Sequence, residues 1–365
     1  MKTSIQNQFS PDYSVHPGEI LEETLQARGL TKREVAARCG MTAKHLNQII
    51  HGKSAVLPEV AISFERVLGV SANVWTNLQC NYSLHRARLE AKQESAGAAE
   101  WAKRFPVAEM IRRNWIVKPG SRRETASVLF QYFGMNNVGA WENWYKTLPA
   151  AYRASPAFKG SQESVAAWLR RGEILAQEIP TQPFNGNNLK PALDEIRKLT
   201  VKSPDEFEPA MKKICAEVGI VLILLAELAK TRLSGVAQWL TKDKALIMLS
   251  LRYKSNDHFW FSFFHEAGHL ILHSKQMTFI DGGRYEDSEL EKEADRFALN
   301  TLIPENKYRG FVSDNPEPTS ASVSAFAKEV GIAPGIVVGR LQHDRNIGFD
   351  KLNNLKEKFQ LVENN

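Results

Sequence analysis

The stretch FSFFHEAGHLILH, from Phe261 to His273, decides how the second half of the chain folds. It places His265 and His269 four residues apart, with Glu266 directly after the first histidine, which is an H-E-x-x-H pattern. One helical turn brings positions four apart onto the same face, so both imidazoles would reach one metal ion. The flanking residues are mostly apolar and include no proline, which predicts a buried helix.

The chemistry of such a helix depends on the residue beside the ligands. Glu266 would lie next to the ion without occupying a ligand position, where it can serve as a general base. The alternative is a buried helix whose two histidines are only hydrogen-bonded. A catalytic zinc ion needs a third protein ligand. His273 is a poor candidate, because it lies about 12 Å along the axis from His265 on a straight helix.

A better third ligand lies in the next helical pattern, Glu289 to Ala298. Glu291 shares a stripe of that helix with small and apolar residues that would face the first helix. Asp295, one turn later, would accept the second N–H of a ligating histidine. Glu293 competes with Glu291, but it projects nearly opposite and is expected to be solvated. Several residues stay open as partners for a substrate carbonyl: Arg252, Tyr253, His273 and Tyr285.

These two motifs carry a resemblance. H-E-A-G-H at 265–269, followed by E-K-E-A-D-R-F-A at 291–298, resembles the ImmA/IrrE family of zinc metallopeptidases over about Glu206 to Pro304. The resemblance implies zinc as the cofactor, His265, His269 and Glu291 as its ligands and Glu266 as the general base. Members of that family cleave a repressor protein, so it also implies a protein substrate.

The N-terminal part predicts a run of five helices separated by short turns. Expected helices are Pro17 to Gly29, Thr31 to Gly40, 43–50 after the cap Thr42, and Pro58 to Leu68, with a fifth from Ser71. Helix, glycine turn, helix is typical of a helix-turn-helix. An edge strand at Ala245 to Arg252, in the C-terminal half, is expected to hold the substrate backbone.

The charge and the outer face of the third helix indicate DNA as the partner. Between Thr31 and Lys53 five cations face one acid, a local net charge of +4 that suits phosphate contacts. Amide side chains read adenine edges and lysine reads guanine, so this face would enter a major groove. The alternative is a surface helix that is only solvated. The expected DNA-binding residues are Lys32, Ala43, Lys44, Asn47, Gln48 and Lys53.

The same segment carries a second resemblance. HPGEILEETLQARGLTKREVAARCGMTAKHLNQIIHGK, within His16 to about Gln79, is similar to the XRE-type helix-turn-helix of HigA antitoxins, above all in its opening H-P-G-E-I-L. The resemblance implies a homodimer on double-stranded operator DNA and, in a toxin–antitoxin setting, a cognate toxin as partner. HigA antitoxins are usually only as long as this domain, and the large C-terminal extension departs from them.

Composition bounds the remaining choices. The 365 residues are 43% hydrophobic and 24% charged, which is ordinary for a globular protein. The net charge of +6 slightly favours an acidic partner but does not by itself indicate nucleic acid. No apolar run has membrane-spanning length, and the N-terminus lacks the apolar core of a signal peptide. The three cysteines form no disulfide pattern and fit a reducing compartment. These features predict a cytoplasmic protein without a membrane partner.

The sequence therefore predicts a mainly α protein with a small β-sheet (α+β). Its expected domains are a helix-turn-helix at 1–81, a helical connector at 82–179, a zincin-like domain at 189–310 and a helical tail at 311–365. The expected function is a DNA-binding regulator or antitoxin of a toxin–antitoxin or phage-related operon, whose zinc-dependent endopeptidase domain cleaves a partner protein. The alternative is a non-enzymatic antitoxin that uses the peptidase-like fold to dock a toxin or another partner.

Overall fold

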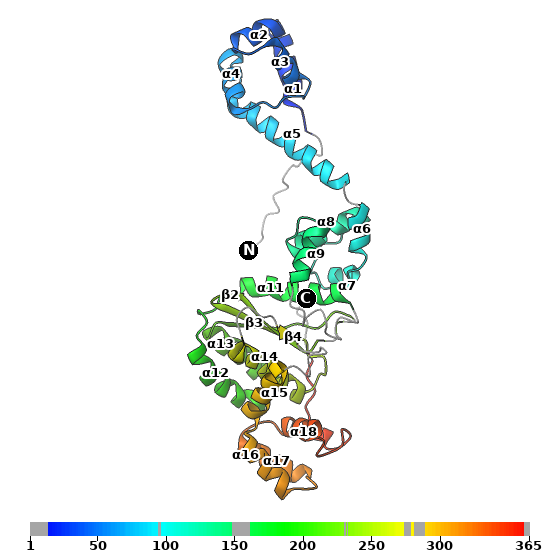
Figure 1. Ribbon diagram of the computed structural model, residues 1–365, viewed down its shortest axis with the longest axis vertical. Coiled ribbons are helices and arrows are strands. Elements are labelled where there is room, and N and C mark those ends of the chain that lie inside the picture. Colours follow the sequence, from blue (N-terminus) through cyan, green and yellow to red (C-terminus); the bar gives the residue numbers. More distant parts are fainter. Residues whose placement is uncertain are drawn as a thin grey trace. The chain divides into compact units, whose positions relative to one another are not determined.

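The computed structural model of the chain describes residues 14–93, 96–147, 161–229, 231, 233–273, 279–280 and 289–360. These residues are mostly helical, with four strands in one sheet, which confirms the predicted fold class (Figure 1). The chain divides into two compact units, Met1–Gly97 and Ala98–Asn365. Each unit is described by itself.

The first unit is built from five helices around one small core. They are α1 Pro17–Ala27, α2 Lys32–Arg38, α3 Ala43–Ile50, α4 Pro58–Leu68 and α5 Ala72–Gln93. The hydroxyls of Thr31 and Thr42 accept hydrogen bonds from backbone N–H groups in the first turns of α2 and α3, which fixes where these helices begin. The helix α5 runs past the boundary that the sequence suggested near residue 81.

Helices also form most of the second unit. The helices that precede the sheet in the sequence are α6 Ala96–Ala102, α7 Val107–Arg112, α8 Arg122–Phe133, α9 Val138–Thr147, α11 Gln162–Glu178, α12 Gly186–Lys198 and α13 Pro204–Glu217. After it come α14 Asn256–Leu272, α15 Glu289–Leu302, α16 Glu305–Asp314, α17 Ser320–Val330 and α18 Pro334–His343. Short 3-10 helices lie at Leu199–Val201 and Asn353–Leu355.

The sheet has the strand order β1-β3-β2-β4. Its strands are β1 Ile220–Leu224, β2 Gly235–Thr241, β3 Lys244–Leu249 and β4 Phe279–Ile280. β3 pairs in parallel with β1 and antiparallel with β2. The expectation that Ala245 to Arg252 forms an edge strand was wrong, because both sides of β3 are hydrogen-bonded to neighbours.

Both faces of the sheet are buried, so the unit has three layers. Alternate strand residues such as Leu222 and Ile247 join the core formed with α12–α18, whereas Val221 and Leu246 join the core formed with the helices of residues 98–179. Figure 1 shows α11 on one side of the sheet and α12–α14 on the other. The helical segment 98–179 thus shares a hydrophobic core with the sheet. Which ranges fold alone stays a prediction.

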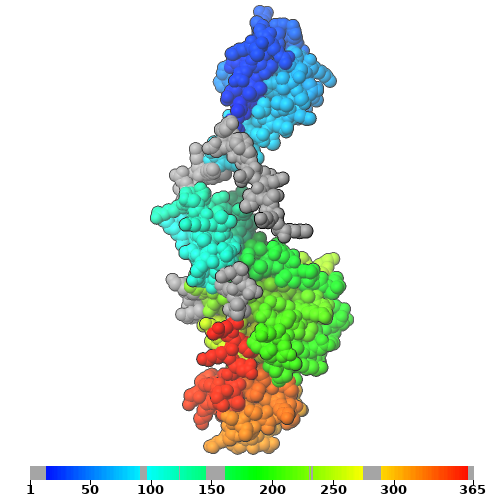
Figure 2. All heavy atoms as spheres, turned by 180° about the vertical axis from the view of Figure 1, so that it is seen from behind, coloured from blue at the N-terminus to red at the C-terminus, as the bar shows by residue number. Residues whose placement is uncertain are grey.

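The C-terminal segment is fastened to the start of α14. Lys356 Nζ lies 2.6 Å from a carboxylate oxygen of Asp257, and both side chains are largely buried. The backbone N–H of Asn256 donates to the carbonyl of Glu357, and that of Phe359 donates to the carbonyl of Lys254. Figure 2 shows the segment from α16 onward, coloured orange to red, gathered at one end of the second unit.

None of the described helices is by itself both long and apolar enough to cross a membrane. The pair α17 and α18, bent by 111° at its break, passes the same test by length and composition only. Residues of both helices, among them Val323 and Val337, belong to the core beneath the sheet.

Candidate metal centre and nucleic-acid interface

The helix α14 brings the H-E-x-x-H residues into the middle of the second unit. His265, Glu266 and His269 are all buried, at 3%, 0% and 1% exposure. Gly268 lets α15 approach closely, since a Cβ atom there would lie 3.1 Å from Phe297 Cδ1 and 3.3 Å from Ala294 Cα. This close packing positions the first turn of α15 against the histidines.

The structure brings His265, His269 and Glu291 together. One candidate ligand atom from each lies within 4.8 Å of the others. The two Nε2 atoms are 3.0 Å apart, and Glu291 Oε2 lies 3.1 Å from His265 Nε2 and 3.5 Å from His269 Nε2. Three heavy atoms thus converge on one point from two helices.

This donor set fits a zinc ion. Two imidazole nitrogens and one carboxylate oxygen form a known catalytic zinc set with a fourth position left for water or substrate. Ligands at about 2.0–2.2 Å from a tetrahedral ion lie about 3.3–3.6 Å from one another. The observed separations of 3.0, 3.1 and 3.5 Å are close to the edges of such a tetrahedron.

The second nitrogen of each histidine also has a partner. His265 Nδ1 lies 2.9 Å from Asp295 Oδ1, and His269 Nδ1 lies 3.0 Å from His273 Nδ1. His273 Nε2 in turn lies 3.3 Å from Glu293 Oε2. Partners of this kind hold the rings in orientation and raise their basicity toward a metal. Glu293, which we expected to be only solvated, is therefore part of this network.

The electrostatics keep the cluster in a form that can hold a cation. Burial lowers the pKa of His269 to about 4, so its ring is neutral near pH 7. Burial alone would raise the pKa of Glu291, but the hydrogen bonds to His265 and His269 outweigh it and lower that pKa to about 2. Neutral imidazole and ionised carboxylate are the forms that bind metals.

Glu266 faces the sheet. A Cβ atom added at Gly235, the first residue of β2, would lie 2.6 Å from Glu266 Oε1 and 2.9 Å from its Cγ. The absence of a side chain at Gly235 is thus what leaves room for the Glu266 carboxylate beside the ligand helix.

Some residues of the site escaped the sequence analysis, and the expected carbonyl partners Arg252 and Tyr253 contact each other and His258. His273 was set aside as a ligand, and its spacing of four from His269 was the signal that the two rings meet. Gly235 carried no signal, because β2 itself was missed. Tyr253 stacks on His258 with ring centroids 4.2 Å apart, and the Arg252 guanidinium lies 5.0 Å from the Tyr253 ring centroid. Tyr285 lies outside the described residues.

In the first unit, the helix pair α2–α3 presents the residues expected to contact DNA. Ala43, Lys44, Asn47 and Gln48 are exposed along α3, while Leu46, Ile49 and Ile50 are buried beneath them. Lys53 is exposed directly after Gly52, which has a φ of 70° in the turn that follows α3. Lys32 differs from the others, because its Nζ lies 2.6 Å from Glu22, which compensates its charge.

The start of the first unit explains the H-P-G motif. His16 Nδ1 accepts a hydrogen bond from the backbone N–H of Gly18, and Pro17 opens α1. A Cβ atom at Gly18 would lie 2.3 Å from the Ile50 carbonyl oxygen, so glycine is needed for α1 to reach the end of α3. The motif thus packs the start of α1 against the C-terminal end of α3.

Family comparisons match one segment in each of the two units. Residues 215–341 match the peptidase M78 family model, described as an IrrE N-terminal-like domain. Residues 21–75 match a helix-turn-helix model. The HTH-type transcriptional regulator YddM of Escherichia coli (strain K12), itself described as uncharacterized, is 35% identical over 71 residues, which is 20% of this chain and 76% of that protein.

The chain belongs to the helix-turn-helix transcriptional regulators. This regulator carries a peptidase M78 domain in its C-terminal part, so both resemblances inferred from the sequence are confirmed. Virulence-associated protein I of Dichelobacter nodosus is 32% identical over 78 residues, 21% of the regulator and 72% of that protein.

Among solved structures, the Pseudomonas aeruginosa antitoxin HigA with the higBA promoter is 29% identical to the regulator. The match covers 23% of this chain and 94% of that chain, with a TM-score of 0.22. A second, PA4674 of the same species in complex with its operator DNA, is 33% identical and covers 20% and 82%, with a TM-score of 0.20.

Proposed function

We propose that the protein represses its own operon through α2–α3, and that its second unit is a zinc-dependent endopeptidase that cleaves a partner protein. The observation that carries the proposal is the cluster of the buried His265 and His269 with the half-buried Glu291, whose ligand atoms lie within 4.8 Å of one another. A structural helix pair has no need to gather three metal-binding groups at nearly tetrahedral spacing.

The chain's own residues divide the work of hydrolysis. His265, His269 and Glu291 would hold the zinc ion, and Asp295 would keep His265 in the tautomer whose Nε2 faces the ion. A zinc ion held there supplies Lewis-acid chemistry toward water and a peptide carbonyl. Glu266 takes a proton from the attacking water at a carboxylate oxygen and delivers it to the leaving amine nitrogen. The elements of water are thereby added across one peptide bond.

The two units then act in one circuit. We infer a homodimer on double-stranded operator DNA, with two half-sites about 34–36 Å apart. The substrate is a protein partner in the cytoplasm, either another protein of the operon, such as a cognate toxin, or a second copy of this chain. Cleavage of that partner would relieve repression.

A reporter strain tests this circuit. With the protein's own promoter driving the reporter, the wild type should repress and be inducible by stress. Glu266→Gln should repress equally well and stay uninducible, because glutamine keeps the shape of the side chain and cannot carry the proton. If the variant induces as readily as wild type, the site does not serve this operon, and a docking role for the peptidase-like fold becomes the better interpretation.

The DNA contacts give a second prediction. In the full-length protein, Lys44→Ala and Gln48→Ala should each weaken operator binding by about 1–3 kcal/mol, with loss of sequence preference at one position. Lys53→Ala should weaken binding to all sequences alike and reduce the dependence on salt, as expected for a phosphate contact. Fluorescence anisotropy over a salt series measures both effects.

The matched control for these changes is Arg66→Ala, an exposed cation on α4 outside the helix pair. It should leave affinity nearly unchanged. If all four variants bind the operator with the affinity of the wild type, the recognition surface lies elsewhere in the first unit.

A further inference from the structure

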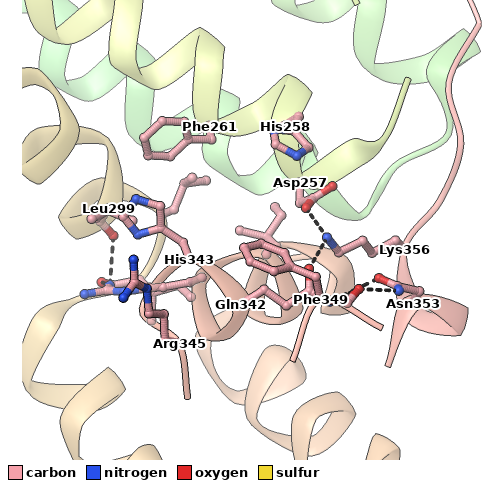
Figure 3. A pocket seen from close by; sticks show the side chains of 15 residues that line it. Asp257, His258, Phe261, Leu299, Gln342, His343, Arg345, Phe349, Asn353 and Lys356 are labelled. Atoms are coloured by element: carbon pink, nitrogen blue, oxygen red, sulfur yellow. Dashed lines mark hydrogen bonds and ion pairs between the residues drawn. The ribbon is translucent and has the colours of Figure 1, made fainter. Parts of the chain in front are cut away.

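A cavity of about 630 Å³ lies in the second unit, and Phe261, one helical turn before His265, is part of its lining. It is bounded by the N-terminal half of α14, the C-terminal half of α15, α18 and the segment that follows α18. Figure 3 shows His258 and Phe261 projecting from α14 into this space, opposite Phe349 and His343. Its volume lies in the range of about 300–1,000 Å³ that is typical of ligand sites.

The cavity continues the line of the metal ligands. His258, Phe261 and His265 lie three and four residues apart, so they share one face of α14. On α15, steps of four, four and three residues lead from Glu291 at the metal cluster through Asp295 to Leu299 and Leu302, which line the cavity. The ring of Phe261 lies 6.0 Å from the ring of His265, centroid to centroid. The lining of the cavity thus begins one helical turn along α14 from His265.

The cavity walls are held in place by buried polar contacts. The Arg340 guanidinium, only 7% exposed at the residue level, donates to the carbonyls of Leu299 and Ile303 and pairs with Glu305. On the opposite side, the ion pair of Lys356 with Asp257 ties the C-terminal segment to α14. A site whose walls are fixed in advance loses little entropy on binding.

The lining defines the chemistry of an occupant. The apolar part of the lining comes from Phe261, Leu299, Leu302, Ile303, Ile336 and Phe349, and Phe349 is 75% exposed as a residue. Arg345, also in the lining, is exposed, and within the described part of the chain its side chain makes no ion pair or hydrogen bond. The cavity therefore complements a bulky apolar group that has a negative charge beside it.

We propose that this cavity binds a bulky apolar side chain of the protein substrate, about three residues from the cleaved bond, with an acidic neighbour on Arg345. The spacing follows from the helix: seven residues from His265 to His258 span about 10 Å, which an extended peptide covers in about three residues. The inference rests on the proposed peptidase function, and it makes the cavity the determinant of where that peptidase cuts.

Binding is measured first, so that turnover is not needed. Full-length Glu266→Gln protein loaded with zinc is immobilised and exposed to a synthetic library of nine-residue peptides, and retained peptides are sequenced by mass spectrometry. Retained peptides should be enriched in Leu, Met or Phe followed or preceded by Asp or Glu. The best of them is then remade with a fluorescent label, and its Kd is measured.

Variants of the cavity provide the contrast. His343→Trp is introduced into the Glu266→Gln protein and places a larger ring in the cavity from an exposed position. It should weaken binding of the labelled peptide by about 10-fold or more. Phe349→Ala should also weaken it, and this exposed position leaves the core untouched. Arg345→Glu should remove the preference for acidic residues. Lys328→Glu, an exposed cation on α17 outside the cavity, should change nothing. Circular dichroism shows that each variant is folded.

The outcomes separate this inference from the proposed function. Retained peptides without an apolar preference would overturn the inference even if wild-type protein cleaves. So would Kd values for the His343→Trp and Phe349→Ala proteins that equal the Kd of the parent Glu266→Gln protein. A different result is that peptides with apolar and acidic residues bind in the cavity but wild-type protein cleaves none of them. That result would support the binding site and refute the proposed peptidase function. Where wild-type protein does cleave, the apolar residue should lie about three positions from the cut.

Discussion

Glu266→Gln is expected to lower the rate of peptide-bond cleavage by about 100- to 10,000-fold, the usual contribution of a positioned general base. Glutamine fills the same buried space beside Gly235 but has no basic oxygen that can hold a proton near pH 7. Zinc content and operator affinity should stay unchanged, because the residue belongs to neither the ligand set nor the first unit. Mass spectrometry of a peptide library cleaved by zinc-loaded full-length protein measures the rate.

A companion change tests the position of the carboxylate. Gly235→Ala leaves Glu266 in place chemically, but its Cβ atom would come within 2.6 Å of Oε1. The fully buried carboxylate must move, so cleavage should fall while zinc stays bound. Undiminished cleavage in Glu266→Gln would mean that another group carries the proton, and undiminished cleavage in Gly235→Ala alone would mean that the carboxylate has room to shift.

His269→Ala is expected to reduce bound zinc from about one ion per chain to none. It removes one of three protein ligands, and loss of even an outer hydrogen-bond partner of a ligand costs about 10- to 100-fold in affinity. Glu291→Ala should weaken binding by about 10-fold or more, and Asp295→Ala should have a smaller effect. Native mass spectrometry gives the stoichiometry, and competition with a chelator gives the affinity.

Two glutamates on α15 serve as controls for the metal. Glu289 is 76% exposed at its side chain and lies 3.4 Å from Lys292, so Glu289→Ala should leave zinc binding unchanged. Among the described residues, Glu293 contacts the cluster through His273, so Glu293→Ala should weaken zinc binding less than Asp295→Ala. Wild-type protein that stays metal-free at saturating zinc would refute the metal centre altogether.

The sequence predicted the first unit closely because its signals are local. Thr31, Thr42 and Pro58 mark helix starts and Gly29, Gly40 and Gly52 mark turns, and each works through contacts within a few residues. The ligand helix was predictable for the same reason. Its histidines are related by one helical turn, and the apolar flanks predicted its burial correctly.

What the sequence hid depends on contacts between distant segments. β2 was missed because GVAQWLT has neither strict alternation nor a continuous apolar run, and its place comes from pairing with β3. Without β2, β3 looked like an edge strand. The cavity also has no local signature, because His258, Leu299 and Phe349 lie in three separate segments.

The two-sided burial of the sheet has a consequence for anyone who trims this chain. A fragment that begins at residue 189 would lack the helices of 98–179 and leave Val221, Ile223, Val236, Leu246 and Met248 bare to water. An uncovered apolar sheet face of this kind invites aggregation. We therefore expect a soluble form of the peptidase-like part to need the helices from α6 onward.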